Sequence, residues 1–142
     1  PEFDIHTEKA VQDTCLSLIR SGYIKSAHDV SDGGLGICLA EMSLVSKGLG
    51  AQITLNSSAD NRLDSPLFGE AQSRIVVAVS PDHAKHVQEA ASENGISAVF
   101  VGNVTASEFC IEVDGETVVK TTPALMLDIY ESAIPNLMSK KK

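Results

Sequence analysis

The stretch His28-Asp29-Val30-Ser31-Asp32-Gly33-Gly34-Leu35 decides how this chain is organised. Residues 24–30 have the character of a strand, and a strongly apolar run follows from Leu35 to Val45. A strand that turns at two glycines into a helix leaves backbone N–H groups at the positive end of the helix dipole. Such a turn suits a phosphate or carboxylate. The side chain of Ser31 or Asp32 would equally cap the helix with no ligand bound.

Helical and extended segments alternate along the rest of the chain. Apolar spacing, Gly and Pro positions predict helices over residues 5–21, 35–47, 65–70, 81–94 and 123–134. Alternating or β-branched runs predict strands over residues 24–30, 51–55, 75–79, 96–104, 108–113 and 116–121. The last two strands flank Asp114-Gly115, which is typical of a two-residue hairpin turn. We therefore expect an α/β fold, a mixed sheet with packed helices.

Two of these segments are predicted to be deeply buried. The helix from Leu35 is apolar nearly all round, so it should be covered on most sides. Glu41 lies inside it, and its carboxylate must reach solvent, a backbone donor or a ligand. The run Ile75–Val79 is apolar on both faces, as expected of a central strand.

Polar side chains gather just before that strand and just before the glycine turn. Glu70, Gln72, Ser73 and Arg74 lead into Ile75–Val79. The Arg74 guanidinium would bind a phosphate or carboxylate in a bidentate way, or pair with Glu70 or Asp29. His28 and Asp29 end the preceding strand, a position where ligands often bind in sheet-and-helix proteins.

Composition excludes several classes of function. The 142 residues include 11 basic and 19 acidic side chains, for a formal net charge of −8. This charge argues against non-specific binding to nucleic acid or to an anionic membrane. No apolar run reaches the roughly 18 residues that span a bilayer. Three widely spaced cysteines, Cys15, Cys38 and Cys110, predict reduced packing residues and a cytoplasmic protein.

Motifs for complete catalytic or metal sites are missing from the sequence. It contains no nucleophile with an evident base, no glycine-rich phosphate loop ending in Lys-Ser/Thr, and no zinc-ligand spacing. His83 and His86 stand three apart on a predicted helix, but no third ligand is near in sequence, so an exposed polar face is favoured. We assign no catalytic residue and no metal ligand.

Two motifs carry a resemblance to a known family. His28–Leu35 is followed by Leu39-Ala40-Glu41-Met42, and Leu67-Phe68-Gly69-Glu70-Ala71-Gln72-Ser73-Arg74 precedes Ile75–Val79. Together, from about Asp13 to Thr121, they resemble the C-terminal domain of the aminoimidazole ribonucleotide synthase-related enzymes. Within that family the resemblance is to the phosphoribosylformylglycinamidine synthases, or formylglycinamide ribonucleotide amidotransferases.

The resemblance implies a function for the whole enzyme and a role for this part of it. The enzyme would be an ATP-binding ligase of purine biosynthesis that converts a formyl amide to an amidine with glutamine-derived ammonia, using ATP and magnesium. The segment described by this sequence would contribute a phosphate- or nucleotide-binding surface to the enzyme. By itself the segment would have no activity. The residues implied in that surface are His28, Asp29, Ser31, Asp32, Gly33, Gly34, Glu70, Gln72, Ser73 and Arg74.

The expected organisation follows from the same resemblance. We expect one domain over residues 1–142, with its core at about 13–134 and a tail at 135–142, forming the C-terminal fragment of a larger enzyme. Its expected partners are the remaining domains, a glutaminase domain or subunit, and small phosphorylated ligands, and the fragment should self-associate through uncovered apolar surface. The alternatives are an architectural domain without a ligand, or the equivalent domain of another member such as aminoimidazole ribonucleotide synthase.

Overall fold

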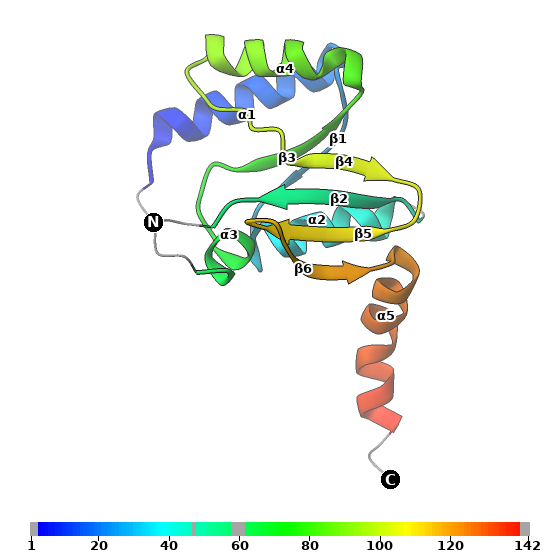
Figure 1. The fold of residues 1–142 in the computed structure, drawn as a ribbon. Helices are drawn as coiled ribbons and strands as arrows, with labels where there is room; N and C mark the ends of the chain where they lie inside the picture. The colour runs from blue at the N-terminus through cyan, green and yellow to red at the C-terminus, as the bar shows by residue number, and fades with distance from the viewer. Residues whose placement is uncertain (1–2, 47, 58–61, 140–142) are drawn as a thin grey trace. The chain divides into compact units, whose positions relative to one another are not determined.

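The computed structural model describes residues 3–46, 48–57 and 62–139, and these form a mixed α/β fold (Figure 1). The helices are α1 (Ile5–Arg20), α2 (Gly34–Val45), α3 (Asp64–Phe68), α4 (Pro81–Glu93) and α5 (Pro123–Ser139). The strands are β1 (Ile24–Asp29), β2 (Gly50–Leu55), β3 (Ile75–Val79), β4 (Gly102–Thr105), β5 (Phe109–Val113) and β6 (Glu116–Thr121). The predicted fold class is confirmed. Lys47, residues 58–61 of the predicted loop and residues 140–142 of the predicted tail lie outside the described residues.

The chain divides into two compact units that alternate along the sequence. The first unit contains Pro1–Cys38 and Leu67–Phe100, and the second contains Leu39–Pro66 and Val101–Lys142. Each unit is therefore built from two separate stretches of chain. The strands form a two-stranded sheet in the first unit and a four-stranded sheet in the second, so the single sheet that we expected is wrong.

In the first unit, β1 and β3 form an antiparallel ladder in which Asp29 lies opposite Ile75. Helices α1 and α4 lie together against this ladder (Figure 1). Their contact surface is centred on three buried side chains, Leu18, Ile24 and Val87. The prediction of a central strand at Ile75–Val79 is wrong, because β1 is its only partner among the described strands and all five residues are half-buried. An apolar composition predicts burial of the two faces, but it does not determine how many strands pair with the edges.

Helix α4 has the predicted ends, but the segment after it differs from the prediction. Ser80 occupies the N-cap position and Pro81 the first turn, although the Ser80 side chain makes no capping hydrogen bond. The strand expected over residues 96–104 is reduced to β4, Gly102–Thr105. Val99 and Phe100, whose apolar side chains favoured the longer strand, are 75% and 65% exposed.

The second unit contains a four-stranded mixed sheet in the order β4-β2-β5-β6. Strand β2 is parallel to β5 and antiparallel to β4, and β5 forms an antiparallel hairpin with β6. The hairpin turn is as predicted, since Asp114 and Gly115 both have positive φ, 51° and 83°. Strand β5 carries the best-buried side chains, Phe109, Ile111 and Val113. Helix α5 continues to Ser139, five residues beyond the predicted end.

Helix α2 follows the glycine turn as predicted, but it is less covered than its composition suggests. Ile37 is 41% exposed and Val45 is 78% exposed, so the expected burial on most sides is wrong for these positions. Glu41 is exposed, which agrees with the interpretation in which its carboxylate reaches solvent.

The cysteines are free thiols, as expected. Cys38 and Cys110 are buried, and Cys15 is half-buried beside the α1–α4 contact. Burial raises the pKa of the Cys15 thiol, which keeps it protonated and unreactive at neutral pH. Within the described residues, no helix has the length and apolar character needed to cross a membrane.

Candidate functional site

The fold brings the two sequence motifs together at one end of the β1–β3 ladder. Because the strands are antiparallel, the residues that follow β1 lie beside those that precede β3. The backbone N–H of Val30 donates to the carbonyl oxygen of Arg74 at 2.9 Å, which extends the ladder by one bond beyond Asp29 and Ile75. The predicted site residues of both motifs therefore belong to one region of the first unit.

The glycine turn is closed by a carboxylate of the chain itself. Gly33 and Gly34 have φ of 81° and 69°, a left-handed conformation that favours glycine. The N–H of Gly34 donates to the carbonyl oxygen of Ser31 at 3.0 Å, and the N–H of Gly33 donates to Oε1 of Glu70 at 2.9 Å. Glu70 thus accepts the N–H of the residue that directly precedes α2, and not a free N–H of the first helical turn for which Ser31 or Asp32 was expected. Within the described part of the chain, neither of those two side chains makes a capping bond, so that prediction is wrong.

Close backbone packing fixes the turn against the end of α3. A Cβ atom on Gly34 would lie 2.7 Å from the carbonyl carbon of Phe68 and 2.9 Å from the carbonyl oxygen of Leu67. These distances are shorter than van der Waals contact, so only glycine fits. The contact holds α2 next to the segment that carries Glu70.

Arg74 is directed at backbone carbonyls and not at a carboxylate. Its Nη2 donates to the carbonyl oxygen of Gly69, and its Nε donates to that of Ala71 at 3.3 Å. The expected ion pair of Arg74 with Glu70 or Asp29 does not occur among the described residues, which corrects that expectation. The loop between α3 and β3 curls around the guanidinium and turns its carbonyl oxygens inward, which gives the planar fork of donors local acceptors.

Ser73 is held by a residue that the sequence did not single out. Its hydroxyl donates to Oε2 of Glu8 in α1 at 2.6 Å, and its φ of 62° is unusual for a residue other than glycine. Hydrogen bonds from Ser73 and then from Gln12 hold the pKa of the Glu8 carboxyl below its ordinary value. An acidic residue in the first turn of a helix is explained by the helix dipole alone, so nothing in the sequence indicated this contact.

The remaining predicted site residues are placed at the rim of this region. His28 is half-buried, and its Nδ1 lies 2.7 Å from the carbonyl oxygen of Asp29. Asp29, Asp32 and Gln72 are exposed. The carboxylates of Asp29, Asp32 and Glu70 are of the type that magnesium prefers, yet the described residues contain no group of three or more side chains placed to hold a metal ion.

His83 and His86 pack on an aromatic ring. The Tyr23 ring centroid lies 5.0 Å from that of His83, in an edge-to-face arrangement, and 4.2 Å from that of His86. His83 is half-buried and His86 is exposed, so the expected exposed polar face holds only for His86. The Tyr23 ring, which follows α1 in sequence, contacts both imidazoles, and these lie in the first two turns of α4.

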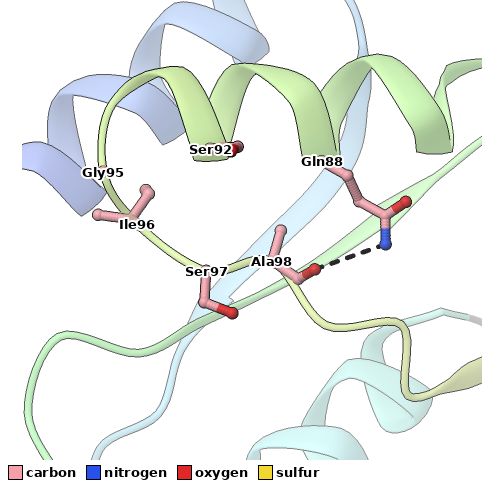
Figure 2. A pocket seen from close by; sticks show the side chains of 6 residues that line it. All are labelled: Gln88, Ser92, Gly95, Ile96, Ser97 and Ala98. Carbon is pink, nitrogen blue, oxygen red and sulfur yellow. Dashed lines mark hydrogen bonds between the residues drawn. The ribbon is translucent and has the colours of Figure 1, made fainter.

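A separate open depression lies where α4 ends (Figure 2). It is lined by Gln88, Ser92, Gly95, Ile96, Ser97 and Ala98. The Gln88 side-chain amide donates to the carbonyl oxygen of Ala98 at 3.5 Å across its edge. None of the predicted site residues lines it, and it contains no charged group that would bind or activate a substrate.

The fold and the glycine turn define this chain as a mixed α/β domain in which a strand turns through two glycines into a helix. Residues 1–114 match the family described as "AIR synthase related protein, C-terminal domain". The chain belongs to this family. The match includes both motifs and most of the range from Asp13 to Thr121 in which the resemblance was expected, so the expected family is confirmed.

Curated relatives and solved structures agree with the family match. The phosphoribosylformylglycinamidine synthase subunit PurL of Salinibacter ruber is 45% identical over 140 residues, which are 98% of this chain and 18% of that protein. The subunit of the same name from Alkaliphilus metalliredigens is 33% identical over 142 residues, 100% of this chain and 19% of that protein. The chain thus spans about a fifth of the length of these relatives.

Two structures from Thermotoga maritima have the same fold. PurL complexed with ATP aligns with a TM-score of 0.79 at 22% identity, over 88% of this chain and 22% of that one. PurLQS aligns with a TM-score of 0.79 at 22% identity, over 89% of this chain and 22% of that one. At this identity the likeness concerns the fold.

Proposed function

We propose that this chain is the C-terminal part of a phosphoribosylformylglycinamidine synthase of the PurL type. The enzyme would be an ATP-dependent ligase of purine biosynthesis that converts a formyl amide to an amidine with glutamine-derived ammonia. The observation that carries the proposal is 45% identity to such a subunit over 98% of the chain. The names of these relatives favour it over the aminoimidazole ribonucleotide synthase alternative.

The 142 residues are proposed to act as one domain that is inactive by itself. In the described part of the chain, the region around the glycine turn offers N–H donors and carboxylates, and its Ser73 hydroxyl is bonded to the Glu8 carboxylate without a histidine to act as base. The test is amidine formation from formylglycinamide ribonucleotide, ATP, Mg²⁺ and ammonia, by the chain alone and by the full-length protein. The proposal is supported if the full-length protein forms the amidine and the isolated chain does not. Amidine formation by the isolated chain contradicts it.

We further propose that the ten predicted site residues contribute a phosphate- or nucleotide-binding surface in the full-length enzyme. Support comes from the meeting of the two motifs at one end of the β1–β3 ladder and from the N–H of Gly33, which directly precedes α2. An anionic ligand there would exchange with the Glu70 carboxylate, because both need the same N–H group. ATP and Mg²⁺ would be held with other parts of the enzyme, since the nearby carboxylates alone repel phosphate.

An architectural role is the second candidate, and one observation favours it. Glu70, Ser73 and Arg74 all hydrogen-bond within the chain, which braces the start of α2 and the loop before β3 without any ligand. Arg74→Ala in the full-length protein separates the two functions, with Arg20→Ala as a matched control on exposed α1. Weaker ATP binding by calorimetry at unchanged urea stability supports the binding surface, and the reverse supports the architectural role.

The cellular location and the partners that we propose follow from the proposed enzyme. It would act in the cytoplasm with a glutaminase domain or subunit, and it would bind neither nucleic acid nor membrane, consistent with a net charge of −8. The solved structure of PurLQS from Thermotoga maritima supports a glutaminase partner for the proposed enzyme. The isolated chain is proposed to self-associate through apolar side chains that α5 exposes.

A further inference from the structure

The loop from Gly69 to Arg74 is attached to the rest of the first unit by two carboxylates. Glu70, from within the loop, accepts the N–H of Gly33, and Glu8, from α1, accepts the hydroxyl of Ser73. The Glu8–Ser73 bond joins residues 65 positions apart. It connects the first turn of α1 to the segment in which four of the ten proposed binding residues lie.

The Glu8 carboxylate is oriented from both sides. Its Oε2 accepts the Ser73 hydroxyl, and its Oε1 accepts the side-chain amide of Gln12, one helical turn further along α1. Both bonds have an ionised acceptor, which makes them stronger than neutral hydrogen bonds. Glu8 is thus a preoriented acceptor aimed at one atom of the loop.

Ser73 needs such an acceptor because its backbone is strained. Its φ of 62° lies in the left-handed region, which costs a residue with a Cβ about 1–2 kcal/mol relative to the right-handed one. Among the described residues with a side chain, only Asp114 shares this feature, and there the two-residue hairpin requires it. At Ser73 no hairpin does so, and the hydroxyl bond to Glu8 offsets the strain.

We propose that Glu8 is a positioning residue for the proposed binding surface, acting through Ser73 on the conformation of Gly69–Arg74. This inference rests on the proposed function. Arg74 follows Ser73 directly, so the backbone angles at Ser73 set where the guanidinium and its carbonyl partners lie. Release of Ser73 would let the loop relax to a right-handed φ and would move Glu70 away from Gly33.

Competition between Glu8 and the ligand for the Ser73 hydroxyl would have the opposite effect on ligand affinity. If the Ser73 hydroxyl bound phosphate directly, Glu8 would compete with the ligand, and its removal would tighten binding. Positioning instead requires that removal weakens binding. The sign of the change therefore distinguishes the two relations.

The experiment compares Glu8→Ala, Glu8→Gln and Glu93→Ala in the full-length protein. Glu8→Gln keeps an oxygen for Ser73, and the Gln12 amide can turn to present its own oxygen to the new NH₂ group. Glu93 is an exposed helix carboxylate of the same unit and serves as the matched control. The readouts are kcat and KM for ATP in the presence of Mg²⁺, and hydrogen–deuterium exchange of peptides covering residues 69–75.

Positioning predicts that Glu8→Ala raises KM and speeds loop exchange by about tenfold each, while kcat changes little. Glu8→Gln and Glu93→Ala should stay within about twofold of the unsubstituted protein. Unchanged exchange in Glu8→Ala overturns the inference, as does a lower KM or faster exchange with an unchanged KM. Absence of turnover in the unsubstituted protein counts against the proposed function instead, and the exchange comparison still decides whether Glu8 holds the loop.

Discussion

Gly34→Ala should strongly destabilise the first unit, for two separable reasons. The first is backbone strain, because φ at Gly34 is 69° and an alanine there costs about 1–2 kcal/mol. The second is overlap, because the new Cβ would lie 2.7, 2.8 and 2.9 Å from backbone atoms of Phe68 and Leu67. Backbone cannot rotate away as a side chain does, so overpacking adds about 1–3 kcal/mol.

Two other glycines isolate these contributions. Gly22 has a φ of 78° but nothing within 4 Å of its Cβ position, so Gly22→Ala measures strain alone, about 1–2 kcal/mol. Gly36 lies within α2, and its nearest atom, the carbonyl oxygen of Leu67, is 3.3 Å away. Gly36→Ala therefore combines a mild contact with a gain in helix propensity of about 1 kcal/mol, and its net effect should be near zero.

Urea unfolding provides the assay. The chain contains no tryptophan, so far-ultraviolet circular dichroism is the suitable probe. A loss of about 3 kcal/mol at a slope of about 1.5 kcal/mol per molar urea lowers the midpoint by about 2 M for Gly34→Ala. If Gly34→Ala loses no more stability than Gly22→Ala, the packing of the turn on α3 is refuted.

Three further predictions concern the turn, the hairpin and the last helix. Glu70→Ala should lower the free energy of unfolding in urea by about 1 kcal/mol, because it removes the acceptor of the Gly33 N–H. Glu70→Gln keeps an acceptor oxygen and should retain most of that stability. Hydrogen bonds from Ser57 lower the pKa of Asp114, so stability should fall as pH drops through that depressed pKa; Asp114→Asn should flatten urea midpoints measured between about pH 5 and pH 2. Ile134 and Leu137 on α5 are 69% and 68% exposed, so Leu137→Glu should reduce self-association by light scattering, unlike Asn136→Glu, and a monomeric parent chain at high concentration would contradict this.

Local signals predicted local structure well. Asp114-Gly115 demands a tight hairpin, and Ser80-Pro81 demands a helix start, because both depend on backbone angles that a few neighbouring residues determine. The number of partners of β3 was not predictable in this way, since pairing joins residues far apart in sequence. The length of β4 was overestimated because Val99 and Phe100 have strand-like side chains but are exposed.

The candidate site shows the same division. The approach of the two motifs was implied by the family resemblance, and the antiparallel pairing of β1 and β3 explains it. The hydrogen-bond partner of each polar side chain was not predictable, because Arg74 and Glu70 each had several candidate partners nearby. Glu8 was missed altogether, since its partner Ser73 is 65 residues away and its position in a first helical turn has an ordinary explanation.

The alternation of the two units along the chain constrains how a ribosome-bound chain folds. The first unit lacks β3 and α4 until residue 93 has emerged, and the second has only β2 of its four strands until residue 101 has emerged. Synthesis of each unit is completed only after synthesis of the other has begun. Strands of both units therefore remain unpaired until residues far along the sequence have been synthesised. Premature termination near residue 100 would leave β2 as an unpaired strand edge, a species prone to aggregation. No single cut in this chain yields two complete halves.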